Sequence, residues 1–269
     1  MKFADPKNDV AFKKIFGDER HKEVLISFLN AILENNEIIK SAKILKSNIL
    51  SVLATTIEDK KIFLRFKNSI SDSQILKKDL EEIEMIIKEN NLKWSEIEYT
   101  LNCLLCDGYI PFKYNDSLVA FWSIQDKYTG RLELGYFDVF VMLDKLDKDI
   151  SKCSTNQEKW IYFINNASDL ELVPKELEDI KEFKTAFETA NTYSWDTKEL
   201  NYYDRVSLKK GDDKNALMTA ERKGLQKGIE KGEKKKQIEI AKNSLNQGLD
   251  IKTVSLITGL TIDEITTLC

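Results

Sequence analysis

The chain has 269 residues, a formal net charge of −4 and a hydrophobic fraction of 42%. This hydrophobic content can fill a folded core and excludes global disorder, and the negative charge excludes a protein that is basic throughout. No uninterrupted apolar run approaches the ~18 residues of a membrane span, so we expect no membrane partner.

The charge is unevenly distributed along the chain. Residues 205–242 contain 12 Lys or Arg and 6 Asp or Glu, which gives this segment +6 and leaves −10 for the rest. We therefore expect a basic tail on an acidic body.

The use of cysteine bears on compartment and on metal binding. Four cysteines without a signal peptide favour the reducing cytoplasm. Cys103 and Cys106 form a CxxC pair, but Cys153 and Cys269 do not form a second one. Zinc would need two more ligands and the chain has a single histidine, so no metal site is predicted.

Two helices are predicted at the start of the chain, over residues 8–16 and 19–33. Gly17 separates them, and Asp18 is suited to cap the second. The second helix has an apolar face with the spacing of a buried helix, formed by Leu25, Phe28, Leu29 and Ile32.

A strand pair is predicted next, over residues 49–55 and 61–67, because both segments are rich in β-branched and aromatic residues. Residues 57–60 would form the turn between them. Alternation places Ile62, Leu64 and Phe66 on one face of the second strand and Phe63, Arg65 and Lys67 on the other.

The middle of the chain gives a weaker pattern. Residues 74–105 are predicted to be mainly helical, with apolar stripes at Ile83, Ile86 and Ile87 and at Trp94, Ile97 and Leu101. Strands are predicted over 118–124 and 136–143, with a turn at 127–130. Residues 158–191 are predicted to be helical, with an apolar face of Trp160, Phe163 and Ile164.

The tail contains a repeat of Lys-Gly at Lys223, Lys227 and Lys231. In a helix these lysines would share one face beside a row of glycines. Each glycine costs about 1 kcal/mol relative to alanine, so the segment is expected to be a solvated, semi-flexible helix or linker. Contact with nucleic acid and packing in a homo-oligomer are the other two uses of such a face.

The last residues predict a small helix-turn-helix unit. A helix over residues 237–246 would end at Gly248, Asp250 would cap a second helix, and Gly259 would turn the chain. Thr261 and Glu264 fit a capping box for the final helix. That helix begins with acids and offers no base-reading side chain, so a packing or protein-contact role is favoured over DNA reading.

Several segments together resemble one family. Residues 5–17 (DPKNDVAFKKIFG) resemble the N-terminus of the recombination-promoting nuclease and transposase family of the PD-(D/E)XK nuclease superfamily. Further segments occur in the order of that family: residues 26–33, 127–130, 143–146, 158–163 and 257–261. No family segment is recognisable between about residues 69 and 116.

The resemblance implies an α/β fold with a restriction-endonuclease-like core, degenerate or trimmed, followed by a helical region and a helical basic tail. We expect the core over residues 1–148 and a helical extension over 149–204. The Lys-Gly segment would span 205–236, and the helix-turn-helix-like unit would span 237–269.

In such nucleases an Asp on one strand and a Glu on the next bind Mg²⁺, and a Lys or Gln two residues later orients the attacking water. A gapless hairpin places these positions on Ser51, Arg65 and Lys67, with Asp9 as an acidic helper on the first helix. Glu58 lies roughly 23 Å along the strand from Ser51 and cannot replace the missing ligand. Mg²⁺ is the cofactor of the family. For this chain we predict that no cofactor is bound and that DNA cleavage is impaired.

Each of these positions has an ordinary structural explanation as well. Arg65 and Lys67 would simply lie on a solvated face of their strand. Alternatively, they would line the groove of the former active site and bind phosphates without cleaving the DNA. Asp9 would favourably oppose the dipole of its helix. The nucleic-acid-binding candidates are Arg65, Lys67, Lys223, Lys227 and Lys231.

Three functions remain open from the sequence. The first is a catalytically impaired family member that retains DNA binding. The second is an active Mg²⁺-dependent DNA endonuclease that uses other carboxylates, for example Glu133 or Asp138. The third is a protein-interaction module, homo-oligomeric through its C-terminal helices and without a nucleic-acid role.

Overall fold

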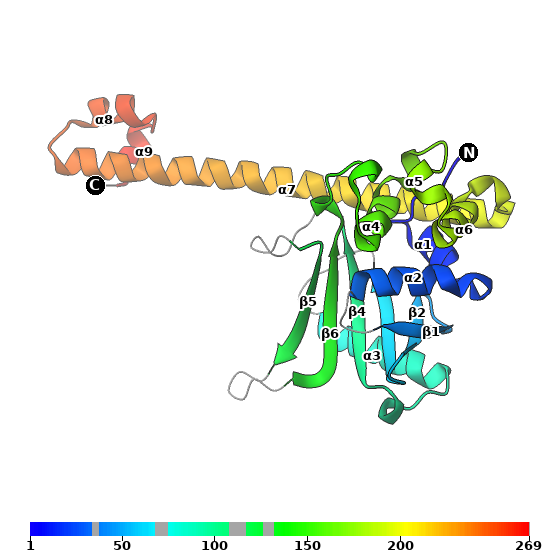
Figure 1. Cartoon of the computed structure of the whole chain (residues 1–269). Coiled ribbons are helices and arrows are strands. Elements are labelled where there is room, and N and C mark those ends of the chain that lie inside the picture. Colours follow the sequence, from blue (N-terminus) through cyan, green and yellow to red (C-terminus); the bar gives the residue numbers. More distant parts are fainter. Residues whose placement is uncertain (34–37, 68–74, 108–116, 126–131, 269) are drawn as a thin grey trace. The chain divides into compact units, whose positions relative to one another are not determined.

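The computed structural model describes residues 1–33, 38–67, 75–107, 117–125 and 132–268 (Figure 1). These residues form two compact units, Met1–Ser207 and Leu208–Cys269. Each unit is described by itself.

The first unit is built on a mixed sheet of six strands in the order β1-β2-β3-β4-β6-β5. The first three strands are antiparallel, β4 is parallel to both β3 and β6, and β5 is antiparallel to β6. The strands are β1 Ile39–Ile44, β2 Ser51–Thr56, β3 Lys61–Lys67, β4 Tyr99–Cys106, β5 Val119–Gln125 and β6 Leu132–Met142.

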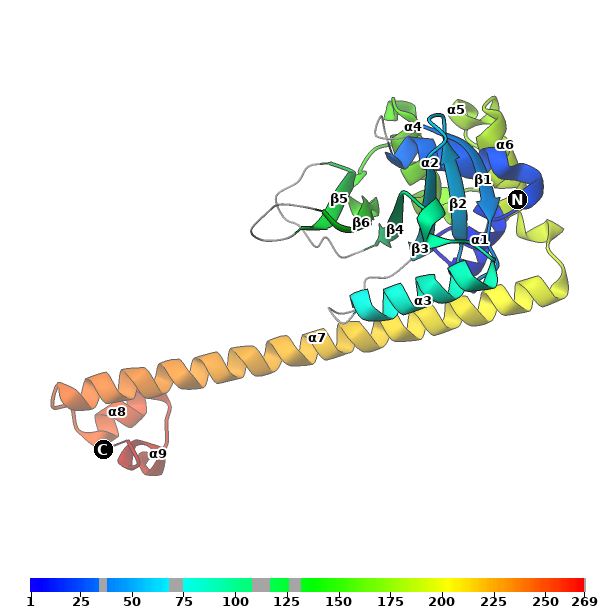
Figure 2. The same ribbon diagram turned by 90° about the horizontal axis from the view of Figure 1, so that it is seen from below.

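Helices cover both faces of this sheet (Figure 2). On one face lie α1 Asp9–Phe16, α2 Lys22–Leu33, α4 Asn156–Asn166, α5 Lys175–Glu178 and α6 Lys181–Ala190. The core on this face is rich in packed aromatic rings, contributed by Phe12, Phe16, Phe28, Phe66, Trp160, Phe163 and Phe183. This extensive burial is the main stabilising contribution in the first unit.

The opposite face is covered in part by α3 Ile75–Glu89, which connects β3 to the parallel strand β4. Ile83, Ile86 and Ile87 of this helix pack with Leu53 and Phe63 of the sheet. A parallel pair needs such a crossover, so α3 allows β4 to enter the centre of the sheet.

The strand pair and its alternation are confirmed. Ile62, Leu64 and Phe66 pack in the aromatic core, whereas Phe63 packs under α3. The expected apolar stripe of Ile83, Ile86 and Ile87 is confirmed in α3, as are the strands near 118–124 and 136–143. The predicted turn at 127–130 lies outside the described residues.

The helical prediction for residues 74–105 is wrong at its end, because Tyr99–Cys106 is strand β4. This strand lies between β3 and β6 and all but its first residue are buried, so apolar residues point to both faces and leave no alternation. Strand β1 was not predicted. Short 3-10 turns complete the unit: Glu19–His21, Trp94–Glu96, Leu143–Lys145, Ile150–Lys152, Ala167–Asp169 and Thr192–Ser194.

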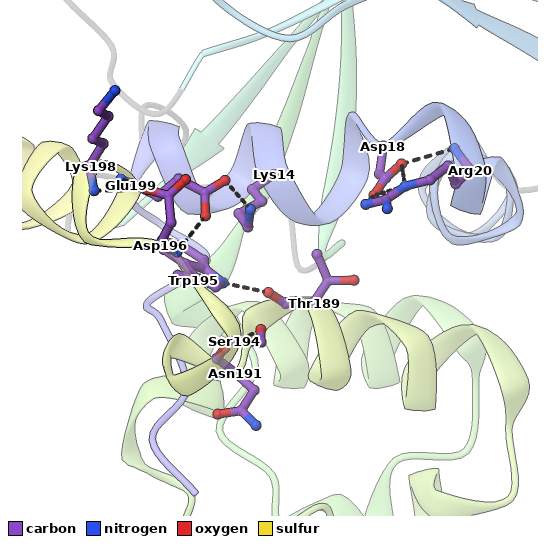
Figure 3. A network of polar contacts seen from close by, with 10 residues as sticks. All are labelled: Lys14, Asp18, Arg20, Thr189, Asn191, Ser194, Trp195, Asp196, Lys198 and Glu199. Atoms are coloured by element: carbon purple, nitrogen blue, oxygen red, sulfur yellow. Dashed lines mark hydrogen bonds and ion pairs between the residues drawn. The ribbon is translucent and has the colours of Figure 1, made fainter.

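The N-terminal segment contacts α6 and the start of α7 Thr197–Asn246, and the Ala4 amide donates to the Ala190 carbonyl of α6 at 2.8 Å. Lys14 forms an ion pair with Glu199, and the Trp195 indole N–H, just before α7, donates to the Thr189 carbonyl of α6 at 2.8 Å (Figure 3). The Asp5 amide donates to the Tyr203 hydroxyl at 2.9 Å. These contacts hold the first two turns of α7 within the first unit.

The second unit contains the rest of α7 with α8 Ile251–Thr258 and α9 Ile262–Thr266. Its small core consists of Ala241, Val254, Leu260 and Ile265. The predicted caps are confirmed: Asp250 caps α8, Gly259 ends it with φ +73°, and Thr261 and Glu264 form the capping box of α9. Residues 237–246 are helical as predicted, as part of α7.

Candidate functional site

The predicted catalytic positions lie in one row across the sheet. Ser51 on β2 is the register partner of Arg65 on β3. The row continues through Asn102 on β4 to Asp138 on β6. Residues in one cross-strand row project to the same face, which here is the face that carries α3.

Arg65 is at the centre of a hydrogen-bond network that follows this row. Its Nε donates to Asn102 Oδ1 at 3.0 Å, and a terminal guanidinium nitrogen pairs with Glu82 Oε2 of α3 at 2.9 Å. Asn102 in turn donates through Nδ2 to Asp138 Oδ1 at 2.9 Å. One fixed cation therefore lies between two carboxylates and links α3 to the sheet.

The interpretation of Arg65 as a solvated side chain is wrong. Its side chain is 0% exposed, whereas that of Glu82 is 42% exposed. A buried cation needs an oppositely charged partner and hydrogen bonds, and Glu82 and Asn102 supply them. Lys67, at the end of β3, is only partly buried.

Asp9 lies in the first turn of α1 and is exposed. The preceding residue, Asn8, caps this helix by accepting from the Val10 amide, and its Nδ2 donates to Ser207 Oγ at 2.8 Å. Lys7 pairs with Asp107 at 3.5 Å, directly after β4. The N-terminal segment that resembles the family therefore lies beside the carboxyl end of strand β4.

The described residues of the row do not fit a divalent cation. Mg²⁺ needs several converging oxygen ligands, and the described part of the chain contains no group of three acidic, His or Cys side chains able to hold a metal. Arg65 brings a fixed positive charge to this row, at the position where the sequence predicts the family's glutamate. Ser51 Oγ is buried and accepts or donates no hydrogen bond among the described residues.

Asp138 does not compensate for these losses. Three strand steps separate it from Ser51, which at about 4.8 Å each amounts to about 14 Å and is too far for shared coordination of one ion. Glu133 is also on β6, but its side chain lies outside the described residues.

Two thiols near the row are buried. Burial, with a smaller contribution from Asp138, raises the pKa of the Cys103 thiol, and burial and then Asp144 raise the pKa of Cys106 to about 11. A raised pKa favours the protonated thiol, which is a poor nucleophile.

Lys223, Lys227 and Lys231 all lie on α7 in the second unit and are exposed. Their spacing of four residues places them along one side of the helix. Space is open beside Gly224, Gly228 and Gly232. The chain therefore presents a solvated row of cations, separate in the sequence from the buried Arg65.

Sequence reasoning missed both partners of Arg65, namely Asn102 of the row and Glu82 of α3. Asn102 was placed in a predicted helix, although the apolar run around it has the composition of a strand buried on both faces. No sequence pattern indicates that Glu82 pairs with Arg65, because that pairing depends on how α3 docks on the sheet.

Comparison with known families agrees with this architecture. A family model described as PD-(D/E)XK nuclease family transposase matches residues 6–103 and 111–220. A second model, described as the Rpn/YhgA-like nuclease family C-terminal HTH domain, matches residues 234–269. The first match covers well over half of the chain, so the protein belongs to the PD-(D/E)XK nuclease family transposases. No curated relative and no solved structure matches the chain.

These matches confirm the family, the α/β fold class and the C-terminal helix-turn-helix unit, a kind of domain associated with DNA binding. Of the two expectations for the core, degenerate or trimmed, the family match favours the first, because it extends through most of the stretch that had no recognisable segment, as do α3 and β4. Within the described residues, no helix has the length and apolar character needed to cross a bilayer.

Proposed function

We propose that this protein is a nuclease-family member that binds DNA but has lost metal-dependent cleavage. The observation that carries the proposal is the buried Arg65, which pairs with Glu82. Arg65 is at the strand position to which we assign the family's metal-binding glutamate. Catalysis in this superfamily depends on a cation that stabilises charge developing on the phosphate. A fixed guanidinium with its own carboxylate partner opposes the binding of that cation.

DNA binding is proposed to reside mainly in the second unit. Lys223, Lys227 and Lys231 are exposed, and salt-sensitive contacts between such lysines and phosphates need no particular base sequence. Arg65 is buried and therefore contributes through the fold rather than by direct contact, while Lys67 stays a candidate contact at the end of β3.

The test is incubation of the purified protein with supercoiled plasmid in Mg²⁺ or Mn²⁺ and in EDTA, at several salt concentrations. We expect retardation of the DNA that weakens with salt, and no nicking in any condition. Nicking that EDTA stops would overturn the proposal and favour an active endonuclease using Asp138 or Glu133. Loss of that nicking in an Asp138→Asn variant would identify the carboxylate.

A second candidate function is protein contact through the helix-turn-helix unit. Leu256, Ile257 and Ile262 are exposed there, Leu256 by 90%. Helix α9 has Asp263 and Glu264 in its first turn, and these acids would be repelled by phosphates. An unchanged DNA affinity in a Leu256→Ser, Ile257→Ser variant, together with altered self-association, would favour this role.

The cytoplasm is the proposed location. The buried cysteines Cys103, Cys106 and Cys153 are free thiols in the structure, which supports a reducing compartment. Fractionation of cells that express the chain would test this assignment.

A further inference from the structure

The positive charge along α7 continues past the lysine row of Lys223, Lys227 and Lys231. Lys234 follows on the same helix, and at roughly 100° per residue it lies within roughly 60° of each lysine of the row. Its side chain is 46% exposed. Cations also occur on other sides of α7, for example at Arg222, so the row is defined by its shared direction. Lys234 is therefore placed to extend the row.

Lys234 has an acidic partner on another helix of the second unit. Its Nζ forms an ion pair with Oε1 of Glu264, in the first turn of α9. The Glu264 side chain is 43% exposed, so the pair is at the surface. An exposed ion pair contributes little to folding, and a phosphate can therefore exchange with the carboxylate.

The position of Glu264 is fixed by contacts on its other side. Its second carboxylate oxygen, Oε2, accepts from the Thr261 amide at 2.8 Å and from the Thr261 hydroxyl at 3.0 Å, as part of the capping box. The next residue, Ile265, packs with Ala241 of α7 in the small core of the unit. Figure 1 shows α9 beside the last turns of α7. The fold therefore directs Oε1 toward Lys234.

Glu264 keeps its negative charge at neutral pH. The Lys234 ammonium, followed by the amide and hydroxyl of Thr261, lowers the pKa of Glu264 from its ordinary 4.5 to about 2. A carboxylate offers an ammonium the same kind of charged acceptor oxygen that a phosphate offers. Glu264 thus occupies the place that a DNA phosphate would take beside Lys234.

We propose that Lys234 is a further phosphate-binding residue of the lysine row and that Glu264 competes with DNA for it. This inference rests on the proposed DNA binding by the row and adds a regulation of that same surface. With α9 docked, the carboxylate neutralises the cation at the end of the row. Movement of α9 away from α7, or loss of the Glu264 charge, makes the fourth cation available.

The test is a Glu264→Gln variant, measured by fluorescence anisotropy with a labelled duplex across a salt series. The glutamine carbonyl can still accept from Thr261, because Gln also serves in capping boxes. Its NH2 group, however, offers Lys234 no acceptor. We expect about threefold tighter binding and a slope of log K against log salt that is steeper by about 1, the effect of one further phosphate contact.

The matched control is Asp263→Asn, which removes the same charge from the same turn of α9. Asp263 is exposed, and successive helical residues point about 100° apart, so its side chain is directed away from that of Glu264. This variant should leave the salt slope unchanged. In a Lys234→Ala background, Glu264→Gln should also leave the slope unchanged, because no cation is then released.

Three results would contradict the competition: an unchanged slope in Glu264→Gln, an equally steeper slope in Asp263→Asn, or a steeper slope for Glu264→Gln in the Lys234→Ala background. If binding in these experiments still depends on Lys223, Lys227 and Lys231, only the role of Glu264 is wrong. A wild-type chain without salt-sensitive binding would instead refute the proposed DNA binding, and this inference with it.

Discussion

The buried row around Arg65 and the exposed face of α7 both contain cationic side chains, but these side chains differ in their exposure to solvent and therefore in their role. Arg65 is fully buried between Glu82 and Asn102, whereas Lys223, Lys227 and Lys231 are exposed. A paired cation inside the sheet is part of the fold, and removal of one partner leaves a buried charge. A solvated row of lysines contributes little to folding but is available to phosphates.

The largest loss of stability should come from removing the ion pair between α3 and the buried row. Glu82→Met leaves the buried Arg65 guanidinium without its carboxylate and should lower the free energy of unfolding by about 3 kcal/mol, the lower end expected for a buried pair because Glu82 reaches solvent. Urea denaturation of the purified chain would measure this. The matched variant Glu81→Met, at the exposed neighbouring position of α3, should cost much less. A loss below about 1 kcal/mol for Glu82→Met would contradict the structural role of the Arg65–Glu82 pair.

The exposed lysines should affect binding but not stability. Replacing Lys223, Lys227 and Lys231 by alanine should make the slope of log K against log salt less steep by roughly 3 and weaken DNA binding by roughly 30-fold. Fluorescence anisotropy with a labelled duplex at several salt concentrations would measure both. Alanine at three exposed lysines of the first unit, Lys93, Lys152 and Lys175, removes the same charge. Equal weakening in that control would show that total charge, rather than the α7 row, determines binding.

A smaller loss of stability is expected from replacing Glu158, a buried carboxylate in the capping box of α4. Glu158 pairs with Lys148 and accepts from the Ser154 amide at 2.7 Å and the Thr155 amide at 3.2 Å. Glu158→Ala should therefore cost about 1.5 kcal/mol, and Glu158→Gln should cost less because the amide can still accept hydrogen bonds. Thermal unfolding at neutral pH would separate the two variants.

The same residue predicts a pH dependence. The ion pair with Lys148, followed by hydrogen bonds from Ser154 and Thr155, lowers the pKa of Glu158 from its ordinary 4.5 to about 2. A depressed pKa means that this contribution is complete above pH 4.5 and is lost as the pH falls through 2. The stability difference between wild type and Glu158→Gln should therefore shrink over this acidic range, and a constant difference would refute the assignment.

The smallest changes in stability are expected from replacing two glycines of the second unit, and the two changes should have opposite signs. Gly259 ends α8 with φ +73°, so Gly259→Ala should destabilise the unit by about 1 kcal/mol. Gly224 lies in α7 with open space around it, so Gly224→Ala should instead raise helicity and stabilise the segment by up to about 1 kcal/mol. Circular dichroism during heating would show shifts of opposite sign. Shifts of the same sign would mean that α7 is not a solvated helix.

The sequence predicted the parts of the fold that depend on short-range patterns. Alternation in β3 correctly placed Ile62, Leu64 and Phe66 on one face and Phe63 on the other, and the Thr-x-x-Glu spacing correctly placed the capping box of α9. These features depend on residues close together in the chain. Periodicity failed for β4, because a strand buried on both faces has no alternating pattern to detect.

The environment of Arg65 could not be predicted, because its partners come from distant elements. Glu82 is 17 residues away on α3 and Asn102 is 37 residues away on β4. Only the crossover that brings β4 beside β3 places Asn102 next to Arg65. The sequence therefore pointed to Arg65 but not to its burial, and burial decides whether this side chain is a surface cation or part of the core.

The most direct test of the account is a calorimetric titration of the chain with Mn²⁺, which replaces Mg²⁺ at oxygen-ligand sites and gives a measurable heat. Because Arg65 of the row is paired with Glu82 of α3, we predict no saturable binding of Mn²⁺ by the wild-type chain. Saturable binding of one ion per chain that is lost in Asp138→Asn or Glu82→Gln would contradict the account and show that the row still forms a metal site.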